Sequence, residues 1–311
     1  MTEYSDMTLY VITGPTASGK SALAVSLAEA LGSEIISADS RQIYRGIPIV
    51  TAVPSQEERR RVPHHLVEIL PLEAYYSASM FREDALRLIP GIMARTGSAV
   101  VCGGSVMYVD ALCNGIDELP TVPPGIRNSL ARLHALKGDS WLIDRLERLD
   151  PDYASRVDRS NIKRVFHSVE ISLTAGRPYS SLLSGRNVSR NPLPWKVVKI
   201  AVDLPREKLF SRINSRVEGM AAAGLVDEIR TVSHKRHLNS LNTVGVKEII
   251  RYLDGEWTLP EALARMAKNT RVYAKKQLTW LRRDSSVRWL TEEDIYSPDI
   301  VDRIISLRNQ G

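Results

Sequence analysis

The sequence predicts an α/β fold: a parallel sheet flanked by helices, with an inserted helical domain. Short apolar runs at residues 9–12, 34–38 and 98–102 have strand character. Helical repeats of apolar residues follow the first and third of these runs, and strands that alternate with helices are typical of a parallel sheet covered on both faces. From about residue 121 to 194 the pattern is helical, without a convincing strand.

The first part of the chain supplies most of the predicted sheet. After the first strand and a glycine-containing loop, Leu23, Leu27 and Leu31 recur at helical spacing, and Gly32 is a suitable C-terminal cap. The third strand runs into Gly103 and Gly104 and then into a further helix. The predicted elements here are a strand at 9–12, a helix at 21–31, strands at 34–38 and 98–102, and a helix at 106–113.

Proline residues delimit the predicted insertion. It starts after Pro120, Pro123 and Pro124 and ends at the Asn-Pro-Leu-Pro run of residues 191–194. We expect helices within it at 126–136, 140–149 and 161–174, then a strand at 197–202, and a helical remainder at 206–223, 226–232, 246–253 and 260 to about 283. Residues 1–120 and 195–311 therefore form the predicted core with a helical C-terminal part, and residues 121–194 form the insertion domain.

Composition excludes several classes of protein. The 311 residues are 43% hydrophobic and 25% charged, which is ordinary for a globular chain and excludes global disorder. Because no run approaches 18 apolar residues, we expect no membrane span. The acidic residues 1–6 resemble neither a signal nor a transit peptide. Cys102 and Cys113 are too few for a disulfide scaffold or a zinc site, which fits a reducing cytoplasm.

The net charge of +6 is unevenly distributed along the chain. Residues 1–120 hold 9 Lys/Arg and 14 Asp/Glu, a net charge of −5. Residues 121–200 hold 14 and 7, a net charge of +7, and residues 201–311 hold 19 and 15, a net charge of +4. An acidic first third and a basic remainder indicate a polyanionic partner that contacts the later segments.

A phosphate-binding loop joins the first strand to the first helix. It matches the pattern G-x-x-x-x-G-K-[ST] with the residues Gly14, Pro15, Thr16, Ala17, Ser18, Gly19, Lys20 and Ser21. Glycines allow successive backbone N–H groups to face phosphate oxygens, Lys20 adds a positive charge, and the Ser21 hydroxyl can hold Mg²⁺. The strand and helix adjoin the loop directly, so we expect a P-loop NTPase-like core.

The acidic residue that P-loop hydrolases carry at the end of a second strand is missing where it would be expected. The strand at 98–102 ends in Gly103, Gly104 and Ser105, with no carboxylate. Asp39 follows the strand at 34–38 instead, at the edge of the sheet where the phosphate loop lies. Asp39 could be a metal ligand, a base acting on an acceptor, or a turn or N-cap residue beside Ser40.

Together these residues resemble the bacterial tRNA dimethylallyltransferase (tRNA isopentenyltransferase) family. The resemblance covers roughly residues 8–290, and its motifs keep the family's order, which makes the set more specific than any single motif. After the phosphate loop, the matching segments are 36–46 (ISADSRQIYRG), 63–66 (PHHL), 76–78 (YSA), 81–85 (FREDA), 103–108 (GGSVMY), Asp150-Pro151 with Arg164 and Glu170, 244–248 (VGVKE) and 270–282 (TRVYAKKQLTWLR).

The resemblance implies a transfer of the dimethylallyl group of dimethylallyl diphosphate to N6 of adenosine 37, beside the anticodon, in tRNAs that read codons beginning with U. It implies that Asp39 acts as the base near N6. Lys20, the loop amides, nearby arginines and Mg²⁺ at Ser21 would stabilise the diphosphate leaving group. Ser105 stands where the family usually has Thr, and its hydroxyl either contacts a phosphate or the bridging oxygen or is a plain N-cap. Thr16 contacts the substrate or caps the loop.

The resemblance also implies a set of tRNA contacts. The flipped adenosine would enter a pocket lined by Asp39, Ser40, Arg41 and Gln42. The other expected tRNA-binding residues are Ser105, Arg127, Lys163, Arg164, His167, Lys247, Arg271 and Gln277. His167 departs from the family, which typically has a second arginine there. Its contact is then weaker, pH-dependent or supplied elsewhere, or His167 is an ordinary surface histidine.

A basic stripe lies on the last long predicted helix. Residues 268, 271, 275 and 282 recur at helical spacing, which suits a phosphate backbone, although a solvated helix face is the alternative. Tyr273 and Trp280 are seven residues apart, a spacing more typical of core residues than of stacking platforms. The run from His234 to His237 lacks a third metal ligand, so we expect a surface turn.

Three other functions fit parts of the pattern. A small-molecule kinase would share the phosphate loop and the strand-end Asp39 but would not need the basic stripe. An RNA-binding switch protein would use nucleotide occupancy without chemistry. An isopentenyltransferase acting on free adenine nucleotides would not need the long basic second half. The main expectation is a cytoplasmic, monomeric enzyme whose partners are the tRNA anticodon loop and dimethylallyl diphosphate, with no membrane contact.

Overall fold

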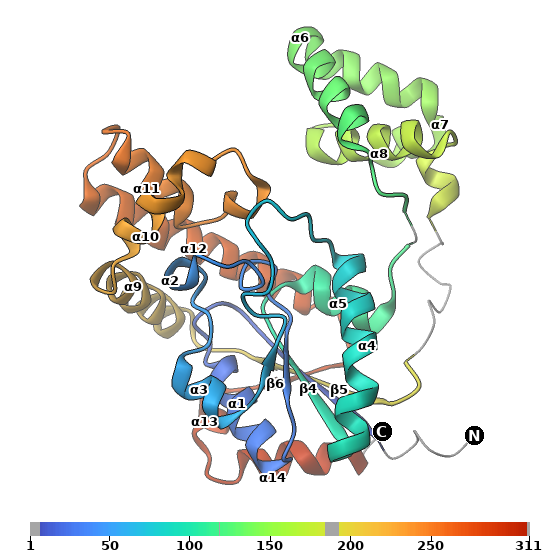
Figure 1. Cartoon of the computed structure of the whole chain (residues 1–311). Helices are drawn as coiled ribbons and strands as arrows, with labels where there is room; N and C mark the ends of the chain where they lie inside the picture. Colours follow the sequence, from blue (N-terminus) through green and yellow to red (C-terminus); the bar gives the residue numbers. More distant parts are fainter. Residues whose placement is uncertain (1–6, 118, 184–192, 310–311) are drawn as a thin grey trace. The chain divides into compact units, whose positions relative to one another are not determined.

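A computed structural model of the chain describes residues 7–117, 119–183 and 193–309. They fall into two compact units, one comprising Met1–Gly115 and Asn191–Gly311 and the other Ile116–Arg190 (Figure 1). The boundaries expected from the sequence, 121 and 194, lie a few residues C-terminal to those of the second unit. Residues 1–6, and residues 191 and 192 of the predicted end of the insertion, lie outside the described residues.

The first unit contains a fully parallel sheet, as the sequence predicts. Its six strands, counted over the described residues, have the order β3-β2-β4-β1-β5-β6, and Leu9 of the central strand pairs with Ala99 on one side and Val197 on the other. The strands are β1 (Thr8–Thr13), β2 (Ile35–Ser37), β3 (His64–His65), β4 (Ser98–Cys102), β5 (Lys196–Val202) and β6 (Val287–Leu290). The phosphate loop leaves the carboxyl end of β1, at the centre of the sheet.

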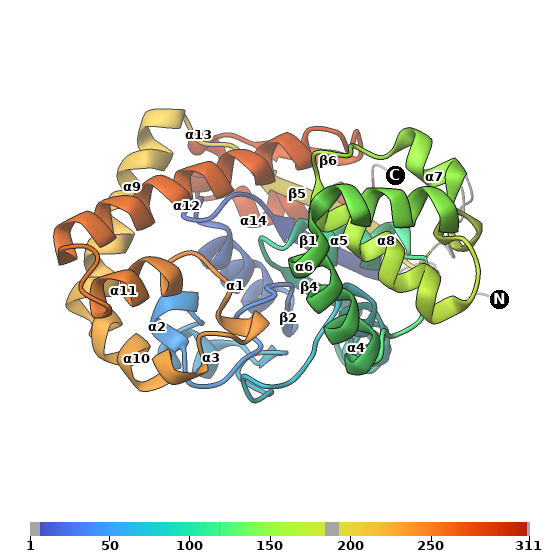
Figure 2. The same ribbon diagram turned by 90° about the horizontal axis from the view of Figure 1, so that it is seen from above.

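Helices cover both faces of the sheet because alternate residues of β1 point in opposite directions. Leu9 and Val11 belong to one buried cluster, and Tyr10 and Ile12 to another. The helices of this unit are α1 (Lys20–Ala30), α2 (Pro48–Thr51), α3 (Gln56–Arg61), α4 (Ala78–Thr96), α5 (Val106–Asn114), α9 (Arg206–Ala222), α10 (Leu225–Val232), α11 (Val246–Leu253), α12 (Leu259–Leu281), α13 (Glu292–Tyr296) and α14 (Ile300–Ser306). Figure 2 shows α9 beside α12, as in Figure 1.

The second unit is helical in its described residues, as the sequence predicts. The helices expected at 126–136 and 140–149 form one element, α6 (Pro124–Leu149), which is kinked at Gly138, where φ is +80° and ψ is −179°. It is followed by α7 (Pro151–Arg156), α8 (Ile162–Ala175) and a short 3₁₀ turn (Tyr179–Leu182). Its core is a single small cluster with buried residues Leu130, Leu142, Leu146, Ala154, Val165 and Val169.

Two elements of the first unit differ from those predicted from the sequence. The segment after residue 202 is not wholly helical, because β6 adds an edge strand beside β5. The four residues of β6 begin and end with an apolar residue. This pattern is too short to distinguish a strand from a helix by periodicity. The longest element that the sequence analysis does not assign is α4, which continues through Pro90 and ends at Gly97. A proline inside a helical pattern ordinarily indicates a helix end, so the pattern understates this helix.

Candidate functional site

The phosphate loop has the conformation that its sequence predicts. Gly14 (φ +140°) and Gly19 (φ +96°) adopt backbone angles that favour glycine, and Ala17 between them is also left-handed, with φ +64°. Lys20 is the first residue of α1, and its ammonium group donates to the Pro15 carbonyl at 3.1 Å. Burial lowers the pKa of Lys20, and the nearby Asp39 carboxylate opposes that shift.

The loops that follow β1, β2 and β4 are hydrogen-bonded to one another. Thr13 Oγ1 donates to the Gly103 carbonyl at 3.0 Å, and the Gly103 N–H donates to the Ile12 carbonyl at 3.1 Å. A Cβ at Gly103 would lie 2.1 Å from the Ala38 carbonyl oxygen, so no larger residue fits between the loops after β2 and β4. These contacts fix the spacing of the three loops at the edge of the sheet where the phosphate loop lies.

Ser105 has a different local role from the plain N-cap considered above. It precedes α5, but its side chain makes no cap hydrogen bond. Instead, its Oγ accepts from the Ser40 N–H at 2.8 Å, while its own N–H donates to the Ala38 carbonyl at 3.1 Å. Ser105 is buried and joins the loop after β4 to the loop that carries Asp39.

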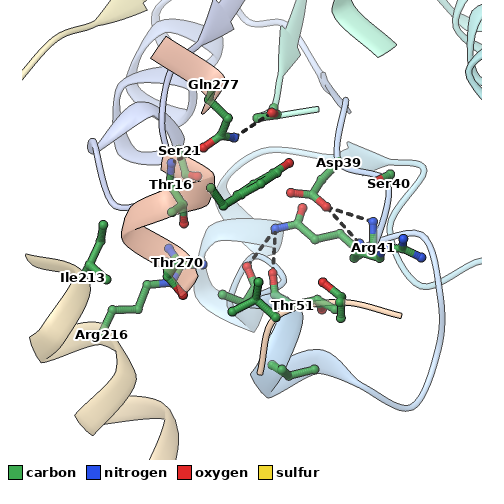
Figure 3. A pocket seen from close by; sticks show the side chains of 18 of the residues that line it. Thr16, Ser21, Asp39, Ser40, Arg41, Thr51, Ile213, Arg216, Thr270 and Gln277 are labelled. Carbon is green, nitrogen blue, oxygen red and sulfur yellow. Dashed lines mark hydrogen bonds between the residues drawn. The ribbon is translucent and has the colours of Figure 1, made fainter. Parts of the chain in front are cut away.

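Asp39 is a turn residue and a wall of the cavity at the same time. Its Oδ1 accepts from the Arg41 N–H at 2.9 Å and from the Gln42 N–H at 3.4 Å, which confirms the turn interpretation. It is not a helix N-cap, because the next helix begins at Pro48. Figure 3 shows the carboxylate directed into the cavity, on the wall opposite Arg216 and Ile213.

A cavity of about 570 Å³ lies at this edge of the sheet. It is lined by residues that are far apart in the sequence and that the sequence predicts to be site residues: Thr16, Lys20, Ser21, Asp39, Ser40, Arg41, Gln42, Lys247 and Gln277. Gly103, Gly104 and Cys102 also line it. Burial raises the pKa of the Cys102 thiol to about 11, so this thiol is neutral at physiological pH. Arg271 and Ser105 are not among the lining residues.

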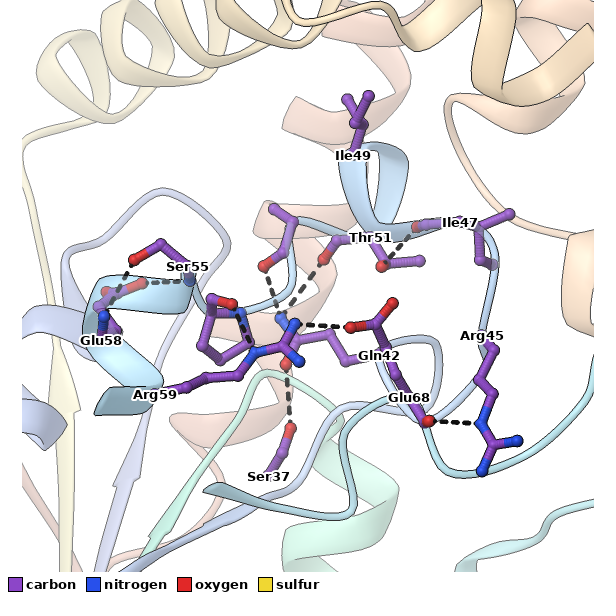
Figure 4. Close-up of polar contacts among 12 residues, drawn as sticks. Ser37, Gln42, Arg45, Ile47, Ile49, Thr51, Ser55, Glu58, Arg59 and Glu68 are labelled. Carbon is purple, nitrogen blue, oxygen red and sulfur yellow. Dashed lines mark hydrogen bonds and ion pairs between the residues drawn. The ribbon is translucent and has the colours of Figure 1, made fainter. Parts of the chain in front are cut away.

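Hydrogen bonds to the backbone hold the side chains of the predicted adenosine pocket in place. Arg41 donates to the Asn239 carbonyl at 2.8 Å. Gln42 accepts from Ser37 Oγ at 3.0 Å and donates to the Ala52 carbonyl at 2.8 Å (Figure 4). Both side chains therefore have fixed directions in the cavity wall.

Gln277 is one of the most buried polar residues of the unit, with 2% of its surface exposed. Its Oε1 accepts from the Thr16 N–H at 3.1 Å, and its Nε2 donates to the Gly104 carbonyl at 2.7 Å. The sequence predicts that Gln277 contacts tRNA. In the structure Gln277 lines the cavity, and its amide joins α12 to the phosphate loop and to the loop after β4.

Arg212 and Arg216 are the functional candidates that the sequence analysis does not name. They lie one turn apart on α9, and Arg212 donates to the Ser18 carbonyl at 3.3 Å. Arg216 lines the cavity, where burial lowers its pKa and Asp39 opposes the shift. In the sequence, two arginines spaced by four residues on a predicted helix indicate that both side chains lie on one face of that helix. Which element that helix faces is decided only by the fold.

One prediction for helix α12, the core position of Tyr273, is wrong. Tyr273 is not a core residue, because 44% of its surface is exposed and it lines the cavity. Of the basic stripe, Lys268 and Lys275 are exposed and make no ion pair with any described residue. Arg271 donates to Asn214 Oδ1 at 2.7 Å, and Arg282 pairs with Asp203 at 3.1 Å.

In the second unit, two predicted tRNA-binding residues converge on one carboxylate. Arg127 Nε donates to Glu170 Oε2 at 2.9 Å, and His167 Nδ1 lies 3.1 Å from Glu170 Oε1. Burial raises the pKa of Glu170, but the hydrogen bonds from His167 and Arg127 outweigh it and hold the pKa below its ordinary value of 4.5. Lys163 and Arg164 are exposed in the first turn of α8.

The run from His234 to His237 lies on the surface, as predicted, and no group of three potential metal ligands (His, Cys, Asp or Glu) occurs among the residues described. Cys102 and Cys113 are both free thiols. None of the helices in the described ranges has the length and apolar character needed to cross a membrane.

A parallel sheet with a phosphate loop at its centre, beside the partly buried Asp39 carboxylate and two arginines of α9, defines a P-loop protein. Residues 42–284 match the family model "IPP transferase". The chain is 46% identical to "tRNA dimethylallyltransferase 2" of Porphyromonas gingivalis, over 94% of this chain and 96% of that protein. It is 44% identical to "tRNA dimethylallyltransferase 1" of Bacteroides thetaiotaomicron, over 92% of each chain.

Solved structures agree with this result. The tRNA delta(2)-isopentenylpyrophosphate transferase of Staphylococcus epidermidis superposes with a TM-score of 0.70 at 30% identity, over 98% of this chain and 99% of that one. A full-length tRNA isopentenylpyrophosphate transferase from Bacillus halodurans gives 0.69 at 34% identity, over 98% and 95%. This chain belongs to the IPP transferase family.

Proposed function

We propose that the enzyme transfers the dimethylallyl group of dimethylallyl diphosphate to N6 of adenosine 37 in tRNAs that read codons beginning with U. The observation that carries the proposal is the placement of Asp39 in the same cavity as the phosphate loop and Arg216. A diphosphate leaving group and a base for the acceptor can then meet in one site. The names of its relatives and the family model support the same reaction.

The phosphate loop and α9 form the proposed diphosphate site. The backbone N–H groups at the start of α1, the Lys20 ammonium and the Arg216 guanidinium would supply positive charge around the leaving group. Both cations are partly withdrawn from water, which strengthens their interaction with a developing diphosphate charge. A free phosphate or a nucleotide would bind the same donors, so the acceptor side of the cavity must select the reaction.

The acceptor side centres on Asp39. In the proposed step, the allylic C1–O bond breaks, and its electron pair leaves with the diphosphate. The N6 lone pair forms the new N6–C1 bond, and the Asp39 carboxylate accepts the N6 proton. Ser40, Arg41 and Gln42 lie beside Asp39 in the cavity wall, where they would contact the flipped base. Ser105 acts through Ser40 in this arrangement, as a positioning residue.

The donor set suits Mg²⁺ held mainly by the substrate. The Ser21 hydroxyl and the Asp39 carboxylate are the oxygen groups that a hard cation prefers, and both line the cavity. Mg²⁺ would be bound by Ser21 together with diphosphate oxygens and water, and when bound it would offset negative charge on the leaving group.

Basic surfaces of each unit fit the tRNA. In the first unit, exposed lysines of α12 and Lys247 supply positive charge near the cavity. In the second unit, Lys163, Arg164, Arg127 and His167 lie at the surface. Arg271 is partly exposed and belongs to the same α12 stripe. Contacts of this kind are with phosphates and depend on salt. We also propose that the enzyme is cytoplasmic and monomeric.

The test is a transfer assay. The full chain is mixed with Mg²⁺, labelled dimethylallyl diphosphate and unmodified tRNA having A at positions 36 and 37. We expect label on the tRNA and release of one diphosphate per transfer. A protein that is folded by circular dichroism but transfers no label would contradict the proposal. Phosphate transfer from ATP to a small acceptor, without tRNA binding, would favour a kinase instead.

A further inference from the structure

Part of the cavity has no role in the steps described above. It is lined by apolar side chains from α2, α9, α12 and the segment before α11, and we call it the apolar lobe: Val50, Ile213, Val217, Met220, Val244 and Met266. All of these except Val244 are buried side chains. A wall made of these six side chains favours a hydrocarbon over a polar or ionised ligand.

The lobe is closed where α2 meets α12. Gly245 has a φ of +95°, and a Cβ at this position would lie 2.4 Å from Val50 Cγ2 and 3.0 Å from Met266 Cε. Val50 and Met266 therefore approach the same point and form a continuous wall. The backbone of Val50 is fixed, because the Glu228 carboxylate accepts from the Ile49 N–H at 2.7 Å and from the Val50 N–H at 2.8 Å.

Helix α9 relates the lobe to the proposed diphosphate site. Arg212 contacts the phosphate loop through the Ser18 carbonyl, and Arg216 lines the cavity one turn further on. Met220 lies another turn beyond Arg216, about 6 Å along the axis at about 1.5 Å per residue. That distance is comparable to the length of a dimethylallyl chain whose diphosphate is held near Arg216.

We infer that the apolar lobe holds the hydrocarbon of the prenyl donor, and that Met220 and Met266 limit this hydrocarbon to five carbons. The inference rests on the proposed prenyl transfer and adds the residues that set donor length. An unbranched methionine side chain fills space next to the cavity. When that side chain is shortened to alanine, the space becomes continuous with the cavity. A ten-carbon donor requires that space, whereas a five-carbon donor does not.

The test compares two donors on one tRNA. Wild type, Met220→Ala and Met266→Ala are assayed with dimethylallyl diphosphate and with geranyl diphosphate, and kcat/KM is measured for each. We expect at least one variant to raise the geranyl-to-dimethylallyl ratio by about tenfold or more, the size of effect that a few methylene groups have in an apolar pocket. The matched control is Met80→Ala, a 37% exposed methionine on α4 outside the cavity, which should leave the ratio unchanged. Unchanged ratios in both lobe variants, or an equal rise in the control, would overturn the inference.

A second variant narrows the lobe instead of widening it. Its expected effect therefore does not depend on creating a cavity in the core. Val217→Leu adds one methylene to the lobe, and we expect the KM for dimethylallyl diphosphate to rise about tenfold. Competitive inhibition by inorganic diphosphate, which has no hydrocarbon, should stay within about twofold of wild type. An equal loss of both would overturn the inference. If wild type itself transfers no dimethylallyl group, it is the proposed function that fails.

Discussion

The two units of the chain use polar and charged side chains in different ways. In the α/β unit, Asp39 accepts from N–H groups of its own turn, whereas Arg41 and Gln277 hydrogen-bond to backbone groups of distant segments, so all three side chains are held by backbone contacts. In the helical unit, Lys163 and Arg164 are exposed at a helix start, and Arg127 and His167 converge on the buried Glu170.

The buried cores differ in the same sense. The α/β unit has two large buried clusters, one on each face of its sheet, whereas the helical unit has one small cluster around Leu142. A small core gives a lower local stability. The comparison indicates that precise placement of reacting groups belongs to the sheet edge and that the helical unit contributes surface charge.

The largest effect is expected at the sheet edge. Asp39→Asn keeps the size of the side chain but removes the base, so kcat should fall by about 10²- to 10⁴-fold, the usual contribution of a general base. The affinity for tRNA, measured by filter binding, should change little. A large loss of affinity with unchanged turnover would remove Asp39 from the base role.

The core of the helical unit is the next test. Leu142 is fully buried, and Leu142→Ala should destabilise this unit by about 2–5 kcal/mol. Hydrogen exchange should then become faster across the described residues of 116–190 and stay unchanged in β1 and β4. Leu136→Ala, at an 80% exposed position of the same helix, is the matched control. Uniform faster exchange in both units would show that they unfold together.

Arg216 tests whether the diphosphate is held from α9. Arg216→Gln removes a charged donor, which should weaken inhibition by inorganic diphosphate by about 10- to 100-fold. Arg206→Gln changes a residue of the same helix that stacks on Phe210 outside the cavity, and should have little effect. Equal effects of the two changes would point to net charge rather than to a contact at Arg216.

Acid should weaken the helical unit through Glu170. The folded-state pKa of Glu170 is below 4.5, so its ionised form stabilises the fold at higher pH, and that contribution is lost as the pH falls through the folded-state pKa. The partners Arg127 and His167 are exposed by 42% and 47%, which limits the effect to about 1 kcal/mol. Thermal unfolding of wild type and Glu170→Gln between pH 7 and pH 3 should converge at the acid end. A constant difference across this range would contradict the assignment.

The smallest effect is expected on the basic stripe. Lys268→Gln or Lys275→Gln should each lower the slope of log affinity for tRNA against log salt by about 1, without changing kcat. Lys235→Gln is the control, since Lys235 is already paired with Glu73 at 2.7 Å. A slope that is unchanged in both stripe variants would mean that this face of α12 is only solvated.

The sequence by itself determined the parallel sheet, the phosphate loop and the strand-end position of Asp39. These are local features: apolar runs give strands, and a glycine pattern between a strand and a helix gives the loop. The helical character of the insertion was also local. Short or interrupted patterns such as β6 and α4 were beyond this reasoning, because their residues carry too little periodicity or contain a proline.

Only the tertiary structure decided which distant residues share the cavity. Arg216, Tyr273 and Met266 come from helices whose contacts with the sheet edge no local pattern specifies. The same spacing that suggested a core role for Tyr273 also permits an exposed one, and burial depends on what lies opposite. Likewise, Gln277 could be recognised as a polar residue of a helix, but its two hydrogen bonds exist only because α12 lies against the phosphate loop and Gly104.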